Sequence, residues 1–218
     1  QMWNECYALA EGDVLMQCGD DIRFRTRHWD SLILGQFLRY PDRIVLVHGE
    51  DGIQGRRIAT HGFIHRRWVQ QVGYFVPPIF ASDYNDMWLT EVADALGRRV
   101  FLPGVLTEHM HPVAGKGPLD RTHQERLERH NIENCDAIWN NTKAERVADV
   151  AKLRAYIEGY AMADQELNNL PQVQCDDTEE THGPHVYLDA GHINYGAGYA
   201  RCEGYTVRVI TDAEIEEK

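Results

Sequence analysis

The sequence predicts an α/β protein, in which short apolar strands alternate with amphipathic helices. Two continuous apolar runs, "DVLMQC" at residues 13–18 and "RIVLVHG" at residues 43–49, have the length and composition of buried strands. Between them, "HWDSLILGQFLRY" at residues 28–40 carries aromatic and aliphatic residues at helical spacing and ends before Pro41. This alternation favours a sheet with a large parallel component that is covered by helices.

The same criteria extend the pattern over the first half of the chain. One helix is expected over residues 2–11 and ends at Gly12, and another begins at Asp83, which can cap it, and ends before Gly97. Further strands are expected at residues 58–64, 98–103 and 104–111. Residues 1–118 are therefore predicted to form one α/β core.

The character of the sequence changes beyond Pro112. A glycine-rich loop, "GKGP", leads into residues 119–163, which are predicted to be helical, with Thr142 and Glu145 in a capping-box pattern. Residues 164–218 contain a polar, acidic linker and two candidate strands, "HVYLD" and "YTVRVIT". We therefore expect a helical extension followed by a small β-containing tail.

The composition excludes several classes of protein. The 218 residues are 43% hydrophobic, which is enough for a real core. The chain contains 22 Lys and Arg against 34 Asp and Glu, and its net charge of -12 opposes unspecific binding to nucleic acid or to an anionic membrane. No apolar run is long enough to span a bilayer, and the five cysteines include no CxxC motif. We therefore expect a soluble, cytoplasmic protein without a membrane partner.

The first candidate for chemistry is the pair of carboxylates at Asp20 and Asp21, directly after the strand at residues 13–18. Adjacent ionised carboxylates repel each other, and a metal ion or a bound hydroxyl group would relieve that repulsion. An Asp-rich turn is the alternative that requires no function. The pair alone does not decide between the two interpretations.

Two later stretches could share a site with this pair. His109 and His111 lie two residues apart, which on a strand places both imidazoles on one face and suits a metal ion; a pair of exposed side chains is the alternative. Asp83 or Asp86 could supply a general base at the mouth of the sheet, although Asp83 could also serve only as a helix cap.

Taken in order along the chain, these motifs resemble the GT-A glycosyltransferases, particularly their family-two-like inverting branch. In that branch a stretch A-x-G-D-x-L-x-x-x-x-D-D leads into the DxD metal and nucleotide motif. A later stretch R-x-x-W-x-x-x-G-x-F precedes an acidic pair, an aromatic residue and a closing histidine. The matching residues are Ala10, Gly12, Asp13, Leu15, Asp20, Asp21, Arg66, Val69, Gly73, Phe75, Asp83, Asp86, Trp88 and either His109 or His111. The resemblance covers residues 1–112 and implies a mixed sheet flanked by helices, equivalent to a partial, Rossmann-like half of a GT-A domain.

The resemblance implies a metal-dependent transfer of a sugar from a nucleotide-sugar donor to an acceptor hydroxyl, with inversion. It assigns the divalent cation, Mn2+ or Mg2+, to Asp21 and to His109 or His111. It assigns the general base to Asp83 or Asp86. Contacts to the nucleotide or the sugar are expected from Asp20, Gly62, Arg66, Trp88 and Lys116.

The match departs from the family in two respects. Gly19 stands in the first position of the DxD motif, which leaves Asp21 as the better metal-binding candidate. The N-terminal half of the family's domain has no counterpart here, so the resemblance implies a missing N-terminal segment or a partner chain in its place. For Arg66 a solvated surface charge, and for Lys116 an ordinary loop residue, are the alternatives to ligand contacts.

The motifs leave the acceptor and the function class open. Similar glycosyltransferases of bacteriophages and bacteria use glycans, proteins or modified DNA bases as acceptors. A metal-dependent hydrolase or nucleotidyltransferase could use the same Asp and His ligands. An inactive, truncated GT-A domain that serves as a binding module is the alternative without catalysis.

Overall fold

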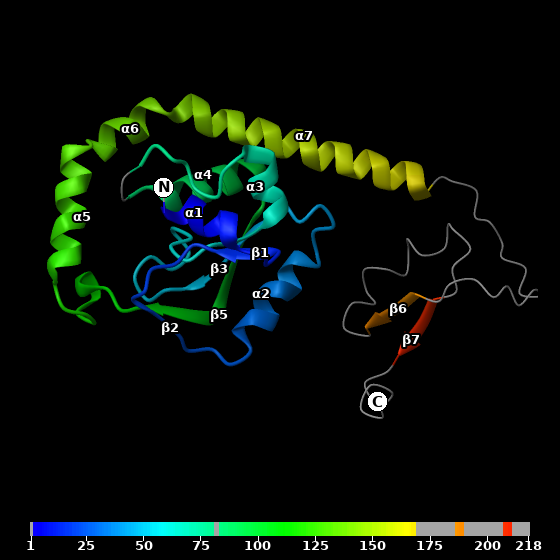
Figure 1. Ribbon diagram of the computed structural model, residues 1–218, viewed down its shortest axis with the longest axis horizontal. Helices are drawn as coiled ribbons and strands as arrows, with labels where there is room; N and C mark the ends of the chain where they lie inside the picture. The colour runs from blue at the N-terminus through cyan, green and yellow to red at the C-terminus, as the bar shows by residue number, and fades with distance from the viewer. Residues whose placement is uncertain (1, 81–82, 169–185, 190–206, 211–218) are drawn as a thin grey trace, which may run out of the picture. The chain divides into compact units, whose positions relative to one another are not determined.

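The computed structural model describes residues 2–80, 83–168, 186–189 and 207–210 (Figure 1). It divides into two units, Gln1–Glu166 and Leu167–Lys218, which are described separately. The first unit is built on a five-stranded mixed sheet with helices packed against it, which confirms the predicted α/β class. Among the described residues, no helix combines the length and the apolar character that crossing a membrane requires.

Short strands form the sheet of the first unit. They are β1 (Val14–Met16), β2 (Ile22–Phe24), β3 (Leu46–Glu50), β4 (Phe63–His65) and β5 (Arg99–His109). Their order is β1-β4-β3-β5-β2, and within this sheet only the β3–β5 pair is parallel. The large parallel component predicted from the sequence is therefore wrong. It fails because β4 returns beside β3 without an intervening helix and β2 pairs with the far end of β5.

Helices pack on the sheet and continue beyond it. They are α1 (Met2–Leu9), α2 (Trp29–Phe37), α3 (Arg66–Val72), α4 (Asn85–Leu96), the 3-10 turn η1 (Pro112–Ala114), α5 (Arg121–Ile132), α6 (Cys135–Asn141) and α7 (Lys143–Asn168). Side chains of β3 alternate between two cores. Leu46 packs with residues of α3, α4 and α7, whereas Val47 packs with Ile33 and Phe37 of α2.

The predicted helical extension is confirmed, and it consists of the three helices α5, α6 and α7. Asn134 has a left-handed backbone (φ 50°) between α5 and α6, and its side-chain oxygen accepts from Ala137 N at 3.3 Å. The Thr142 hydroxyl donates back to the carbonyl of Ile138 at 2.7 Å. The predicted capping box at Thr142 is therefore wrong, because this hydroxyl closes α6 instead of opening α7.

Helix α7 is held against α4 by buried polar contacts. The buried carboxylate of Asp149 accepts a hydrogen bond from Trp88 Nε1 at 3.1 Å and another from the Tyr74 hydroxyl. Arg146 is also buried, and its guanidinium lies 3.8 Å from the centroid of the Trp139 ring. Because buried polar groups need such partners, these contacts fix the extension to the core.

The second unit contains two described strands, β6 (Val186–Asp189) and β7 (Val207–Ile210). They pair in parallel, with Val186 opposite Val207. The strands predicted in the tail are therefore confirmed, while residues 169–185 of the predicted linker lie outside the described residues.

Strands β3 and β5 approach each other most closely at Gly49. Up to Gly49 the two strands pair residue by residue, but Glu50 pairs with Leu106, so residues 103–105 bulge out of register. A Cβ atom on Gly49 would lie only 2.3 Å from the carbonyl oxygen of Val105, and only glycine fits there. The bulge explains why the sequence pattern predicted two strands, at residues 98–103 and 104–111, where the structure has the single strand β5.

Replacing Gly49 with alanine should destabilise the sheet, because the added Cβ would overlap the carbonyl of Val105. We expect a loss of about 1–3 kcal/mol in the free energy of unfolding, as for other overpacked positions. Gly104→Ala is the matched control on the same bulge, since no atom lies within 4 Å of its added Cβ. Urea unfolding of both variants and the parent chain measures the difference, and equal stabilities would contradict the close approach.

Candidate functional site

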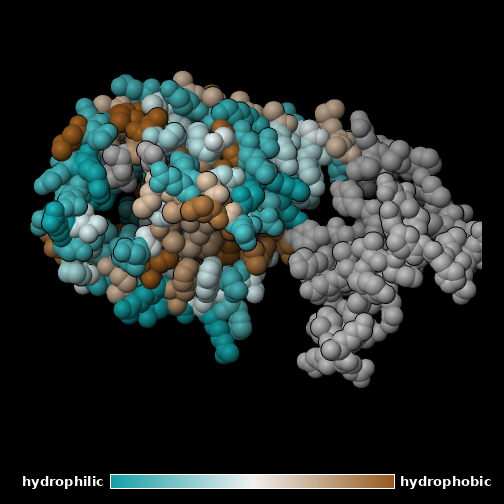
Figure 2. Space-filling model, viewed as in Figure 1, coloured by the Kyte–Doolittle hydropathy of each residue, from teal (hydrophilic) through white to brown (hydrophobic). Residues whose placement is uncertain are grey.

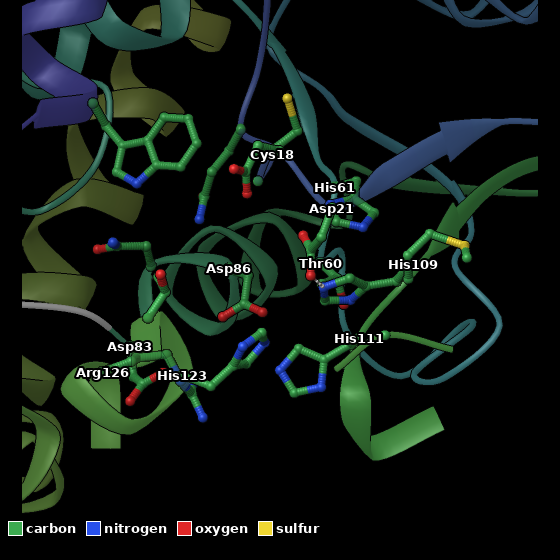
Figure 3. Close-up of a pocket in the computed structure, with 18 of the residues that line it drawn as sticks. Cys18, Asp21, Thr60, His61, Asp83, Asp86, His109, His111, His123 and Arg126 are labelled. Atoms are coloured by element: carbon green, nitrogen blue, oxygen red, sulfur yellow. Dashed lines mark hydrogen bonds and ion pairs between the residues drawn. The ribbon is translucent and has the colours of Figure 1, made fainter. Parts of the chain in front are cut away.

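A pocket with a volume of about 590 Å³ lies among segments that are far apart in the sequence (Figure 3). They are the start of α1, the turn after β1, the loop before β4, the start of α4, the end of β5 and helix α5 with the loop before it. The sequence-predicted residues that line this pocket are Asp20, Asp21, Asp83, Asp86, His109 and His111. The structure therefore brings both predicted acidic pairs and both predicted histidines to one place.

One side of the pocket carries a carboxylate–imidazole pair, Asp21 and His109. Asp21 Oδ2 lies 3.1 Å from His109 Nε2. The backbone sets this contact, because Ile22 is paired with His109 in the β2–β5 ladder and Met110 N donates to Asp21 O at 2.7 Å. A carboxylate oxygen and an imidazole nitrogen are both common metal ligands, so the pair offers two donors to one divalent cation.

Four imidazoles follow one another along the pocket (Figure 3). The ring centroids of His61, His109, His111 and His123 lie 4.8, 5.0 and 4.9 Å apart in that order. Only 4% of His61 is exposed, and burial lowers its pKa to about 4, so its ring is neutral at pH 7. Burial also lowers the pKa of His111. A neutral imidazole can accept a hydrogen bond or bind a metal ion, so these rings are in the form that a polar ligand requires.

Asp83 and Asp86 have different surroundings. Asp83 is engaged by helix α5: it accepts from Nη1 of Arg126 and pairs with His130 Nδ1 at 2.6 Å. Asp86 lies in the first turn of α4, where one carboxylate oxygen accepts from Met87 N at 2.8 Å. Burial raises the pKa of Asp86, which is the environment of a general base that works near neutral pH.

The residue that caps α4 is Tyr84, and the predicted cap at Asp83 is wrong. Tyr84 has a left-handed backbone (φ 70°), which is unfavourable for a tyrosine and occurs most often at functional sites. Its hydroxyl donates to Asp136, and its ring stacks on Trp139 with centroids 5.1 Å apart. These contacts fix the position of the turn before α4. Asp86, which follows this turn, lines the pocket.

Buried polar atoms without a partner are concentrated in this pocket. In the part of the chain that the structure describes, eight buried side-chain nitrogen or oxygen atoms lack a hydrogen-bond partner. Six of them belong to lining residues: Gln17 Oε1, Thr60 Oγ1, both ring nitrogens of His61, Asn85 Oδ1 and Arg126 Nε. Because buried polar groups are nearly always satisfied in folded proteins, this concentration indicates a surface prepared for a polar ligand.

Four residues that the sequence assigned to ligand contacts do not line the pocket. Trp88 is buried in the core against α7, and Gly62 is buried where its Cβ would contact β3. Arg66 donates to the backbone carbonyl of Gly12 at 2.9 Å and so ties α3 to the turn before β1. Lys116 forms an ion pair of 2.7 Å with a carboxylate of β5. The side chains of Trp88, Arg66 and Lys116 therefore have structural contacts outside the lining, and Gly62 lies close against Leu46 of β3.

Sequence reasoning missed a second group of lining residues. Among the missed residues, only those of helix α5 follow a sequence pattern. Basic residues three or four positions apart share one helical face, so their spacing could have indicated a basic face. The polar residues at the ends of β1, at the start of β4 and at the start of α4 follow no period, so no pattern marked them. The missed residues are Gln17, Cys18, Thr60, Asn85, His123, Arg126 and Arg129.

Gly19 leaves the space in which the Asp21 side chain lies. A Cβ atom on Gly19 would be 2.6 Å from Asp21 Oδ1. An aspartate at position 19, as in a full DxD motif, would therefore push Asp21 away from His109.

The side chains of the pocket are too few to coordinate a cation without further oxygen atoms from the substrate or water. The described ranges contain no group of three or more His, Cys, Asp or Glu side chains placed to bind a metal ion. Asp21 and His109 would supply two ligands, and substrate oxygens or water would have to supply the rest, as is usual for Mg2+ and Mn2+ at phosphate-binding sites.

Comparison with protein-family models, with curated proteins and with solved structures gives no match. Function is therefore inferred from the pocket itself.

Acid should destabilise the protein through two buried histidines. Burial lowers the pKa of His48 in β3 and of His61 in the pocket to about 4, from an ordinary value of 6.5. Between these values the unfolded chain binds more protons than the folded one, so stability is complete above pH 6.5 and falls as the pH drops toward 4. Each histidine contributes up to about 1.4 kcal/mol per pH unit.

Urea unfolding at several pH values between about 7 and 4.5 measures this loss. His48→Gln should flatten the pH dependence. The control His28→Asn, at an exposed histidine with a left-handed backbone that asparagine tolerates, should leave it unchanged. A free energy of unfolding that does not change over this range would show that neither histidine is held neutral by burial.

Proposed function

We propose that this chain carries the metal-binding and catalytic part of a GT-A-like glycosyltransferase, which moves a sugar from a nucleotide-sugar donor to an acceptor hydroxyl with inversion. The observation that carries the proposal is the pairing of Asp21 with His109 in the same pocket as the carboxylate of Asp86. These three residues also follow the order along the chain that the GT-A resemblance requires.

Asp21 and His109 would hold the divalent cation. The carboxylate suits both Mg2+ and Mn2+, and the imidazole favours Mn2+ of the two. When bound, such a cation neutralises the charge that develops on a departing diphosphate. His111, whose ring centroid is 5.0 Å from that of His109, is the second histidine within reach of the ion.

Asp86 would accept the proton of the acceptor hydroxyl. A carboxylate whose pKa is raised by burial takes up a proton more readily than an exposed one. The polar groups that Thr60, His61 and Asn85 contribute to the same lining are uncharged at pH 7. Such groups donate to and accept from hydroxyls, so they suit the neutral, hydroxyl-rich sugar of the donor.

Exchange of Asp21 for asparagine should weaken the Mn2+-dependent binding of UDP by about tenfold or more, because one of the two protein ligands loses its charge. Titration calorimetry of the full chain with UDP, with and without Mn2+, measures the affinity. Asp30→Asn is the control, since Asp30 is an exposed carboxylate in the first turn of α2. An Asp21→Asn variant with the parent affinity for UDP and Mn2+ would rule out this cation site.

Exchange of Asp86 for asparagine should leave Mn2+-dependent UDP binding intact and lower the turnover of UDP-glucose by about a hundredfold or more, as expected for a lost general base. Release of UDP, with water as the acceptor, is the measurement. Asp83→Asn is the matched comparison at the start of the same helix and should lower turnover less, because Asp83 is bound to α5. If Asp83→Asn were the more damaging exchange, the two roles would have to be reversed.

A further inference from the structure

Helix α5 presents a basic face to the pocket. The side chains that it contributes to the lining are Thr122, His123, Arg126 and Arg129. His123, Arg126 and Arg129 follow one another at intervals of three positions and therefore share one helical face, which Thr122 borders. Neither glutamate within α5, Glu125 or Glu128, lines the pocket, and the one carboxylate that the helix adds to the lining is that of its N-cap residue Asp120. Figure 2 shows mainly hydrophilic residues over this part of the surface.

The two arginines retain hydrogen-bonding capacity toward the pocket. Arg126 donates through Nη1 to Asp83, while its Nε is buried without a partner among the described residues. Arg129 is the other arginine that lines the pocket. His123 is oriented by Asp120, which lies 2.8 Å from its Nδ1. Such a face suits an anion with several oxygens, because a guanidinium binds such groups through two parallel hydrogen bonds.

Arg126 of this basic face lies away from the cation-binding pair, whereas His123 adjoins His111, with ring centroids 4.9 Å apart. In Figure 3, His61, Asp21 and His109 lie on one side of Asp86, and Arg126 lies on the other. The net charge of the chain is -12, so the general field of the protein repels anions and a local cluster of arginines is needed to attract one. An anion held by α5 would therefore lie beside the residue assigned as general base.

We propose that His123, Arg126 and Arg129 form a subsite for a phosphate group of the substrate, independent of a bound cation. The assignment of that substrate as a donor or an acceptor of a sugar rests on the proposed function, whereas the subsite itself does not. The phosphate would belong either to the diphosphate of the donor or to an acceptor that carries a phosphate near its reactive hydroxyl. Arg129 carries the decisive charge, because Arg126 is shared with Asp83.

The experiment is a titration of the full chain with inorganic phosphate in the presence of EDTA and at constant ionic strength. Tryptophan fluorescence reports binding, because Trp3 lines the pocket. Saturable binding is expected, and Arg129→Gln should weaken it about tenfold, as for a lost charge-assisted hydrogen-bonded contact. Arg121→Gln is the matched control on the same helix, where 90% of the arginine side chain is exposed, and should leave the affinity unchanged.

Two results would overturn the subsite. One is phosphate binding that does not saturate, and the other is an equal loss of phosphate affinity in Arg129→Gln and Arg121→Gln. A second titration with UDP and Mn2+ identifies the source of the phosphate. If Arg129→Gln also weakens UDP binding, the group belongs to the donor diphosphate; if UDP binding is unchanged, it belongs to the acceptor. Saturable phosphate binding without any Mn2+-dependent UDP binding would overturn the glycosyl transfer and uphold the subsite.

Discussion

The pocket depends on the backbone register between β2 and β5. Ile22 lies opposite His109 in that ladder, and the chain just beyond it adds the 2.7 Å hydrogen bond from Met110 N to Asp21 O. His109 N is also bound, at 2.9 Å, by the carbonyl of Asp51. A slip by one residue would turn His109 to the opposite face of the sheet and separate it from Asp21. Main-chain hydrogen bonds therefore decide which side chains meet.

The two sides of the pocket are held by different forces. The end of β5 and the start of α4 continue into the buried core, where residues such as Trp88 and Val105 are almost fully enclosed. Helix α5 buries none of its side chains, and its contacts to the pocket edge include the ion pairs of Arg126 and His130 with Asp83 and the ring contact of His123 with His111. Apolar packing is insensitive to salt, whereas partly exposed ion pairs are screened by it. The α5 side is therefore the more adaptable one.

Burial on one face leaves a helical period in the sequence of α2 and α4, and burial of a whole strand leaves a continuous apolar run in β1 and β3, so these four elements were predictable. The direction of β4 and the pairing of β2 were not, because they depend on contacts between distant segments. The candidate site divides in the same way. Asp21, Asp86 and His109 belong to an ordered series of motifs, whereas Thr60 and Arg126 reach the pocket only because their loop and helix meet there.

The contact between Gly19 and Asp21 has an evolutionary consequence. Any side chain at position 19 enters the space of the Asp21 carboxylate, so the effect of a substitution at one position depends on the residue at the other. The two positions are therefore epistatic. A descendant of this chain could not acquire the first aspartate of a DxD motif, at position 19, in a single step without displacing the Asp21 carboxylate that already faces His109.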